Sequence, residues 1–278
     1  MKKTNKTAST ICITLLFVFL FAPILVLIVF SFNAGKSTVN MSGFSFRWYR
    51  NLFTDGATLE ALRNSVILAV TSAVISTVMG TAAAYGITKM RRKFLKSTVM
   101  TVTNIPMMNP DIITGISLML MFVFVGGLLR FSESLNFFTM LIAHVTFCLP
   151  YVILSVMPKF NQMDKSMPEA ALDLGCTPIQ SLFKVELPEI MPGVMTGGLM
   201  AFTMSLDDFV ISYFTKGSSF QTLPLLIYGM TKKTVTPKIY ALATIIFFVI
   251  LILLLISNII SSRDERKQAK IRKSLNKT

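Results

Sequence analysis

Long apolar runs alternate with short polar segments along the whole chain. Six of these runs predict membrane-spanning helices, at residues 11–32, 64–88, 98–125, 135–157, 194–214 and 239–260. Each is close to the roughly 20 residues with which an α-helix crosses the hydrocarbon core. The first run has 22 residues without a charge, which is longer than the apolar core of a signal peptide, about 7–15 residues. We therefore expect an uncleaved first span after a polar N-terminus, residues 1–10, and an all-α polytopic membrane protein with six transmembrane helices.

The composition supports this fold class. Hydrophobic residues make up 53% of the 278 positions and charged residues only 14%, whereas a soluble domain carries about 25% charged residues. A net charge of +14 in a soluble chain would suggest a nucleic-acid partner. In a polytopic chain it indicates cytoplasmic loops that face anionic membrane lipid, so we expect membrane lipid and no nucleic acid as a partner.

The distribution of Lys and Arg predicts the orientation. If the N-terminus is cytoplasmic, 18 of the 27 basic residues lie inside and 9 outside. The strongest cluster follows the second span without an intervening acid: Lys89, Arg91, Arg92, Lys93 and Lys96. This bias predicts N-in, C-in topology, with the long loop 158–193 and the basic tail 261–278 in the cytoplasm.

The cytoplasmic loop 158–193 contains a polar stretch that predicts two short helices. Ser166, with a glutamate three residues later, is typical of a capping box, and Gly175 is a favourable left-handed stop for the same helix. Thr177-Pro178 predicts the N-cap and first residue of a second helix, which Pro188 should end. Apolar side chains on both helices would form an exposed ridge between membrane spans. The loop is therefore a candidate docking surface.

The sequence contains no constellation typical of an enzyme. The sole histidine, His144, lies in the middle of the fourth span with no carboxylate near it in sequence, and hydrogen bonding between packed helices is the usual role of such a residue. The three cysteines are isolated, which indicates neither a disulfide framework nor a metal site. No glycine-rich phosphate-binding loop is present. We expect no catalytic site, cofactor or metal in this chain.

Three intramembrane acids are the strongest candidates for a functional site. Asp207 and Asp208 lie 13 and 14 residues into the fifth span, and Asp111 follows a stretch interrupted by prolines. A charge near the bilayer centre costs about 2.5–3.5 kcal/mol, so these acids should face a cavity or a partner. One helix face carries Ala201, Ser205, Asp208 and Ser212, and this small, polar stripe suits a pore wall. The alternative is structural: ion pairs within the bundle, or protonated carboxyl groups.

Trp48 is the only tryptophan and lies in the polar connection after the first span. One interpretation is an interfacial helix that anchors this connection, because aromatic residues favour the membrane–water boundary. The other is a ring that stacks on a substrate cation at the mouth of the pore.

The docking stretch also carries a family resemblance. Glu169-Ala170-Ala171, Gly175 and Leu187-Pro188 stand at the spacing of the EAA loop of bacterial ABC importer permeases, and only Val185, in place of isoleucine, departs from that pattern. The resemblance implies a type I, MetI-like permease core in the bacterial inner (plasma) membrane. It also implies that Glu169, Ala170, Ala171, Gly175, Leu187 and Pro188 couple the permease to a separate ATPase.

Further segments resemble a subgroup of this family. Residues 205–212, residues 222–224 and residues 46–50 are similar to spermidine/putrescine permeases of the PotC type. This implies a polyamine substrate, a second permease subunit, a dimeric cytoplasmic ABC ATPase that carries ATP and Mg, and an extracytoplasmic substrate-binding protein. Because polyamines are cations, we expect the substrate path to be lined by the following residues: Trp48, Asp111, Ser205, Asp207 and Asp208.

Other function classes remain as alternatives. Related permeases for ferric iron or other small solutes share parts of the same motifs. A secondary transporter or channel would work without an ATPase, but it usually shows internal repeats with paired broken helices, and only one span is broken by prolines. A membrane-embedded enzyme would need clustered His, Asp or Glu ligands that this sequence lacks.

Overall fold

The computed structural model describes residues 6–37, 40–130, 134–164, 166–218, 220–232 and 236–275. Residues 1–5 of the expected N-terminus and 276–278 of the expected tail lie outside this range. The described chain is almost entirely helical, which confirms the all-α fold class. Its helices are α1 (Lys6–Ser31), α2 (Arg47–Thr54), α3 (Gly56–Lys89), α4 (Lys93–Met108), α5 (Asp111–Leu128), α6 (Phe137–Gln162), α7 (Ser166–Asp173), α8 (Pro178–Ser181), the π-helical segment η1 (Leu182–Glu186), α9 (Leu187–Asp207), α10 (Val210–Thr215), α11 (Leu223–Thr231) and α12 (Pro237–Leu275).

The chain forms two compact units, residues 1–60 with 226–250 and residues 61–225 with 251–278. In the first unit, the indole N–H of Trp48 donates to the carbonyl oxygen of Asn33 at 2.7 Å, which ties α2 to the chain that follows α1. Lys238 Nζ lies 2.7 Å from Asp55 Oδ2 and connects α12 to the α2–α3 junction. This hydrogen bond from Lys238 lowers the pKa of Asp55 below its usual value.

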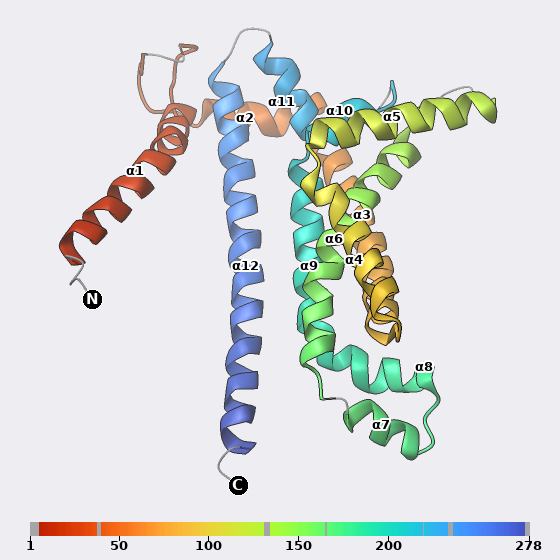
Figure 1. Ribbon diagram of the computed structural model, residues 1–278. Helices are drawn as coiled ribbons and strands as arrows, with labels where there is room; N and C mark the ends of the chain where they lie inside the picture. The colour runs from red at the N-terminus through yellow and green to blue at the C-terminus, as the bar shows by residue number, and fades with distance from the viewer. Residues whose placement is uncertain are drawn as a thin grey trace. The chain divides into compact units, whose positions relative to one another are not determined.

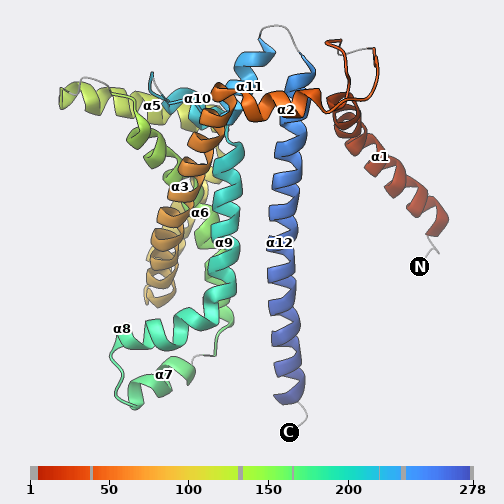
Figure 2. The same cartoon turned by 180° about the vertical axis from the view of Figure 1, so that it is seen from behind.

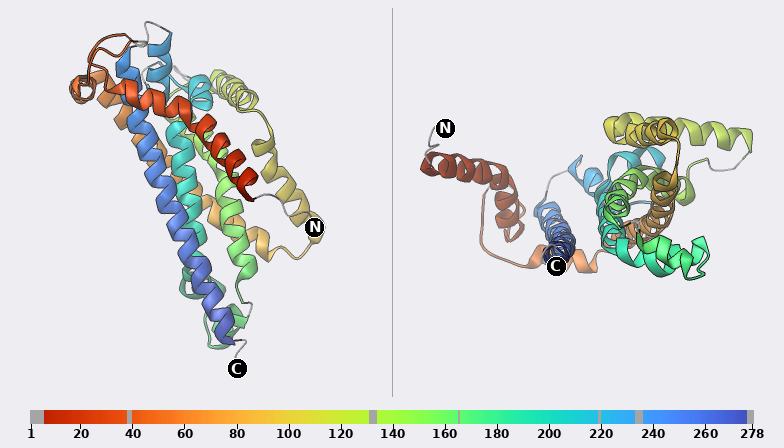
Figure 3. Two further views of the ribbon diagram at one scale, coloured as in Figure 1. Left: turned by 90° about the vertical axis from the view of Figure 1, so that its left-hand side faces the viewer. Right: turned by 60° about the horizontal axis from the view of Figure 1, so that its bottom comes forward.

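The second unit is built around α6 and α9, which pack along each other (Figures 1 and 3). Gly193 and Gly197 of α9 form a Gly-x-x-x-Gly pattern of the kind that lets membrane helices approach closely. A Cβ atom at Gly197 would lie 3.3 Å from Val152 Cα, and one at Gly193 would lie 3.1 Å from the Ser155 carbonyl oxygen. These contacts leave little room for a larger residue, so the two glycines permit the α6–α9 contact.

Two ends of this bundle carry different elements. Helices α7 and α8 lie at one end, whereas α5 and α10 lie at the other (Figures 1 and 2). The last residue of α3, Lys89, forms an ion pair with Glu186 of η1, so the basic connection after α3 is at the same end as α7 and α8. This agrees with the expectation that both face the same side of the membrane.

Residues 98–125, expected as one span, form two helices. The break falls at Asn109-Pro110, where Asn109 is extended with φ −79° and ψ 142°. A proline lacks the backbone N–H and disfavours a helical conformation in the preceding residue. Helix α4, with 16 residues, is about 24 Å long, and α5 then turns across the end of the bundle (Figure 1). There Gly115 of α5 lies against Phe214 of α10.

The expected fifth span, 194–214, is also divided, between α9 and α10. Asp208 is extended, with φ −63° and ψ 123°, and ends α9. Within the described residues, five helices are long and apolar enough to cross a membrane: α1, α3, α5, α6 and α12. Helix α9 is not among them, because its prolines, glycines, threonines and acids reduce its hydropathy. The count of six spans therefore stays a prediction.

Two further differences concern the expected tail and the connection between the fifth and sixth spans. Helix α12 continues through the expected tail as far as Leu275, because residues 261–275 contain no proline or glycine and are rich in good helix formers. The expected outer connection between the fifth and sixth spans contains a helix, α11, whose 9 residues are too few for their apolar pattern to distinguish a helix from a loop.

Candidate functional site

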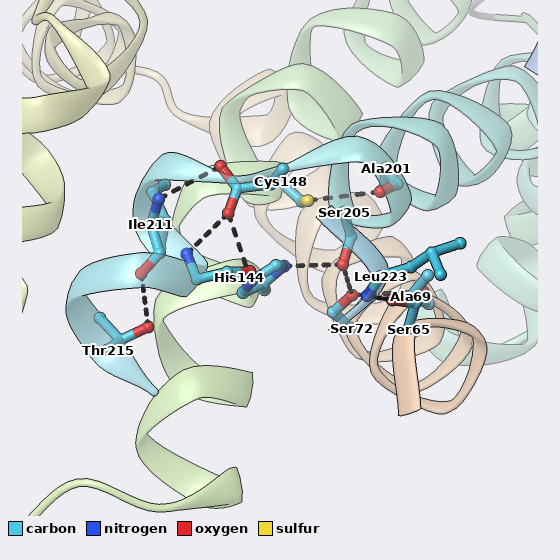
Figure 4. Close-up of polar contacts among 12 residues, drawn as sticks. Ser65, Ala69, Ser72, His144, Cys148, Ala201, Ser205, Ile211, Thr215 and Leu223 are labelled. Carbon is cyan, nitrogen blue, oxygen red and sulfur yellow. Dashed lines mark hydrogen bonds and ion pairs between the residues drawn. The ribbon is translucent and has the colours of Figure 1, made fainter. Parts of the chain in front are cut away.

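A buried polar cluster lies inside the second unit, where α3, α6, α9 and α10 meet (Figure 4). We call it the His144 cluster, and its members are Ser72, His144, Ser205, Asp208 and Ser212. His144 Nδ1 lies 2.8 Å from Ser205 Oγ, and Nε2 lies 3.0 Å from Ser212 Oγ. Ser72 Oγ donates to Ser205 Oγ at 2.8 Å. Packed helices are thus joined through one imidazole, which agrees with the helix-packing role expected for His144.

Asp208 provides the charge of the cluster. Its Oδ1 accepts a hydrogen bond from the backbone N–H of Ile211 at 3.3 Å, and its Oδ2 accepts one from Ser212 at 2.8 Å. The same Oδ2 is 3.6 Å from His144 Nε2, and the Asp208 side chain is only 6% exposed. A carboxylate that accepts N–H groups at the start of a helix satisfies donors that would otherwise lack partners. Asp208 therefore caps the first turn of α10.

The residues expected to form a polar pore wall are buried within this chain. Ala201, Ser205 and Ser212 are all buried, and they face α3 and α6. The expectation assumed a continuous helix from 201 to 212, whereas α9 ends at Asp207 and α10 begins after the extended residue Asp208. Whether Ser205 and Asp208 line the substrate path stays a prediction.

The other two acids differ from Asp208, because both are exposed. Asp207 is the last residue of α9, and Asp111 is the first residue of α5. Asp111 lies within electrostatic range of Tyr151, and Asp207 of Cys148, one turn earlier on α6. Two exposed carboxylates thus lie near the same part of α6, at the end of the bundle that carries α5 and α10.

Trp48 belongs to the first unit and is 7% exposed. Its indole N–H donates to the Asn33 carbonyl oxygen, and the guanidinium of Arg47 lies 5.7 Å from the centre of its ring. These contacts fit the anchoring interpretation. A contact between Trp48 and a substrate stays a prediction.

The loop 158–193, expected to couple to an ATPase and called the coupling loop below, has the two helices that the sequence predicts. Gly175 has φ +86°, and the turn after α7 is a Schellman motif, in which Cys176 N–H donates to the Ala171 carbonyl and Gly175 N–H to the Leu172 carbonyl. The predicted cap of α8 is confirmed, because the Thr177 side chain accepts from Gln180 N–H and the Gln180 side chain accepts from Thr177 N–H.

The cap of α7 differs from the expected one. Helix α7 does begin at Ser166, but the backbone N–H of Ser166 donates to Asp164 Oδ1 at 3.0 Å. Asp164, two residues upstream, is thus the capping acceptor in place of the Ser166 side chain. This hydrogen bond to its charged form lowers the pKa of Asp164 below its usual value.

Pro188 does not end the second helix, contrary to the prediction. The chain passes from α8 through the π-helical segment η1 into α9, and Leu187 N–H donates to the Leu182 carbonyl five residues earlier. The wider π turn lets Pro188 enter at the first turn of α9, where its missing N–H leaves no helical bond unmade. The coupling loop therefore continues into α9 without a break in the helical backbone.

The surface of the coupling loop is apolar in the way a docking surface requires. Leu174, Ile179 and Phe183 are exposed on 87%, 69% and 62% of their surface. Glu169 and Gly175 are also exposed, whereas Ala171 is buried. Large apolar side chains that remain exposed on a loop between membrane-spanning helices indicate a partner surface.

An ion pair connects this loop to α3. Lys89 Nζ lies 3.1 Å from Glu186 Oε1, and the Glu186 side chain is only 2% exposed. The Lys89 ammonium also lies 5.3 Å from the centre of the Tyr85 ring. Among the described residues, Glu186 Oε2 is one of the few buried polar atoms without a hydrogen bond. The junction between coupling loop and bundle therefore depends on one charge on α3.

Sequence reasoning missed two of these pairings. His144 and Asp208 are 64 residues apart, and Lys89 and Glu186 are 97 apart. The sequence signal for these pairings was that a lone histidine or a lone acid in apolar surroundings requires a polar partner. Their partners follow only from the tertiary contacts. Among the described residues, no group of three or more His, Cys, Asp or Glu is placed to hold a metal ion.

Comparison with known proteins identifies the relatives of the chain. The putrescine transport system permease protein PotI of Escherichia coli (strain K12) is 36% identical over 252 residues, covering 91% of this chain and 90% of the relative. The spermidine/putrescine transport system permease protein PotC of Haemophilus influenzae is 38% identical over 248 residues, covering 89% and 94%. PotC of Escherichia coli (strain K12) is 38% identical over 254 residues, covering 91% and 93%.

Solved structures show the same fold. A bacterial ABC transporter involved in the import of the acidic polysaccharide alginate superposes with a TM-score of 0.68 at 17% identity, covering 93% of this chain and 98% of the other. An amino acid ABC transporter superposes with a TM-score of 0.53 at 20% identity, covering 78% and 95%. Residues 76–266 match the sequence profile described as "Binding-protein-dependent transport system inner membrane component". The chain belongs to this family of inner-membrane components of binding-protein-dependent transport systems.

Proposed function

We propose that the chain is a permease subunit of an ATP-driven ABC importer for polyamines, the class of spermidine and putrescine. The proposal includes a second permease subunit, a dimeric cytoplasmic ATPase that holds ATP and Mg, and an extracytoplasmic binding protein. The sequence relatives are named for putrescine and spermidine transport, which supports the substrate class. The chain itself contributes half of the pore and no ATPase site.

The observation that carries the substrate assignment is the exposure of Asp111 and Asp207. Helix α5 begins at Asp111 and α9 ends at Asp207, at the end of the bundle opposite α7 and α8 (Figure 1). A substrate delivered from outside would enter at this end. A polyamine that leaves water loses hydration at its ammonium groups, and a carboxylate can replace that hydration through charge-assisted hydrogen bonds. The attraction must also be weak enough for release.

The coupling loop supports the other half of the proposal. An apolar ridge of Leu174, Ile179 and Phe183 suits insertion into a hydrophobic cleft of the ATPase. Because η1 continues directly into α9, movement of the docked loop would act on the helix that ends at Asp207.

The experiment is uptake by the native complex in proteoliposomes, with the binding protein outside and ATP inside. We expect ATP-dependent uptake of labelled spermidine or putrescine, no competition by a ferric chelate, and a KM raised by about tenfold or more in Asp207→Asn. Glu189→Gln is the matched control, because it removes the same charge from the opposite end of the same helix, where Glu189 is exposed. ATP-dependent uptake of ferric iron without polyamine uptake would replace the substrate assignment, and uptake independent of ATP would refute the ABC mechanism.

A further inference from the structure

Asp208 adjoins the proposed substrate contact, Asp207, yet the two side chains have different surroundings. Asp207 is exposed, whereas the Asp208 side chain is 6% exposed and both of its oxygens accept backbone N–H groups of α10. A polyamine could reach Asp208 only by displacing these contacts and opening the core. The structure thus separates two neighbouring acids that the sequence presents as equivalent.

The hydrogen bonds of the His144 cluster involve both imidazole nitrogens. On one side, Ser205 Oγ lies 2.8 Å from both Ser72 Oγ and His144 Nδ1. On the other side, His144 Nε2 faces Ser212 Oγ at 3.0 Å and Asp208 Oδ2 at 3.6 Å. The imidazole therefore connects α3 and α9 on one side with the start of α10 on the other.

This connection lies where the chain turns between α9 and α10. Asp208 is extended between two helices, and such a break needs partners for the donors at the start of the second helix. Asp208 accepts the Ile211 and Ser212 N–H groups, and His144 contacts both Asp208 and Ser212. Asp207 is the residue immediately before this break, so its direction depends on the geometry of the turn.

We propose that His144 and Asp208 are positioning residues, which hold the α9–α10 turn so that the Asp207 carboxylate points into the substrate path, and that Asp208 itself does not contact substrate. This inference rests on the proposed transport function. It assigns a role to His144 and gives Asp208 a role different from that of Asp207.

The first test compares the KM for spermidine of two variants in the reconstituted complex. Asp208→Asn removes the charge but keeps a side-chain oxygen for the N-terminus of α10, since Asn and Asp are equally good caps. We expect the KM for spermidine to change by less than about twofold in Asp208→Asn, because the retained oxygen still holds the turn and Asp207 keeps its direction, whereas Asp207→Asn raises KM by about tenfold or more. A rise of KM in Asp208→Asn equal to that in Asp207→Asn would overturn the inference, because it would mean that the substrate uses the charge of Asp208 itself.

The second test uses two replacements of His144 that keep different halves of the ring. The amide of Gln reaches the position of Nε2 and can still donate toward α10, whereas the shorter Asn reaches only the position of Nδ1. The readout is the labelling rate of Asp207→Cys by a cationic thiol reagent, in a chain whose three native cysteines are replaced. We expect His144→Asn to slow labelling by about tenfold and His144→Gln to change it by less than about threefold, because only Gln keeps the contact with α10.

Equal labelling rates in the Asn and Gln variants would overturn the positioning role, even if both variants lower thermal stability. A merely structural role would change the yield of folded complex without changing the labelling rate of the folded fraction. If the parental complex does not take up polyamine, the proposed function fails by that result alone. The labelling experiment needs no transport and still decides whether His144 directs residue 207.

Discussion

Glu186 shows how a single buried charge depends on one partner. Its side chain is 2% exposed, and its ion pair with Lys89 has an oxygen–nitrogen distance of 3.1 Å. Lys89 is half exposed and can regain water if the pair is broken. A buried carboxylate cannot, so removal of the lysine leaves an uncompensated charge. The two halves of this ion pair should therefore respond differently to substitution.

We expect Lys89→Met to destabilise the chain by about 1–3 kcal/mol, because it leaves the Glu186 carboxylate buried without its partner. Glu186→Gln should cost about 1 kcal/mol or less, because it removes the charge and leaves a solvated lysine. Thermal unfolding in detergent measures both. Arg92→Met is the control, since Arg92 is an exposed cation of the same connection. A loss in Lys89→Met no larger than in Arg92→Met would contradict this account.

At the scale of elements, the turn between α7 and α8 depends on the backbone conformation of Gly175. Gly175 adopts φ +86°, and a residue with a Cβ in the left-handed region costs about 1–2 kcal/mol. The Schellman turn directs the chain from α7 into the capping box of α8, and this fixes the exposed ridge. Glu169, which is exposed on α7, is the acid of the motif that faces the proposed ATPase.

We expect Gly175→Val and Glu169→Lys to abolish binding-protein-stimulated ATP hydrolysis while the chain still inserts into the membrane. The first disturbs the turn between the coupling helices, and the second reverses a charge on the docking surface. The assay is ATP hydrolysis by the reconstituted complex, with membrane content measured on the same samples. Gly86→Ala is a matched control, because a Cβ at Gly86 would meet no atom within 4 Å. Normal stimulation in both coupling-loop variants would exclude the loop as the ATPase contact.

At the scale of the whole molecule, the two ends of the second unit should lie on opposite sides of the membrane. Asn64 lies in the N-terminal part of α3, and its Nδ2 donates to the Gln221 carbonyl oxygen at 3.1 Å. Arg92 follows the C-terminal end of the same helix. From Asn64 to Lys89, α3 rises about 38 Å, which exceeds the hydrocarbon core of about 30 Å. Gln221 and Arg92 are therefore suitable reporters of orientation.

We expect a membrane-impermeant thiol reagent to label Gln221→Cys in intact cells and to label Arg92→Cys only after permeabilisation. The background replaces Cys12, Cys148 and Cys176, of which Cys12 is exposed. The reverse pattern would place the coupling loop outside the cell and refute the N-in, C-in topology.

The sequence by itself determined the elements whose causes are local. Apolar runs of about 20 residues predict spans because the bilayer has a defined thickness. Gly175, Thr177 and Pro178 predict a turn and a helix start because their backbone and side-chain preferences act within a few residues. The EAA pattern indicates the family from the sequence alone, because all of its residues lie within one short loop.

Only the tertiary structure decided how distant residues meet. Asp207 and Asp208 have the same chemistry and adjacent positions, yet one is exposed and the other caps α10 beside His144. The break at Asp208, the π turn before Pro188 and the Lys89–Glu186 pair likewise depend on packing between helices. Local preference cannot specify these features, because the cost of a buried charge or an unpaired backbone group is set by whichever partner the fold brings to it.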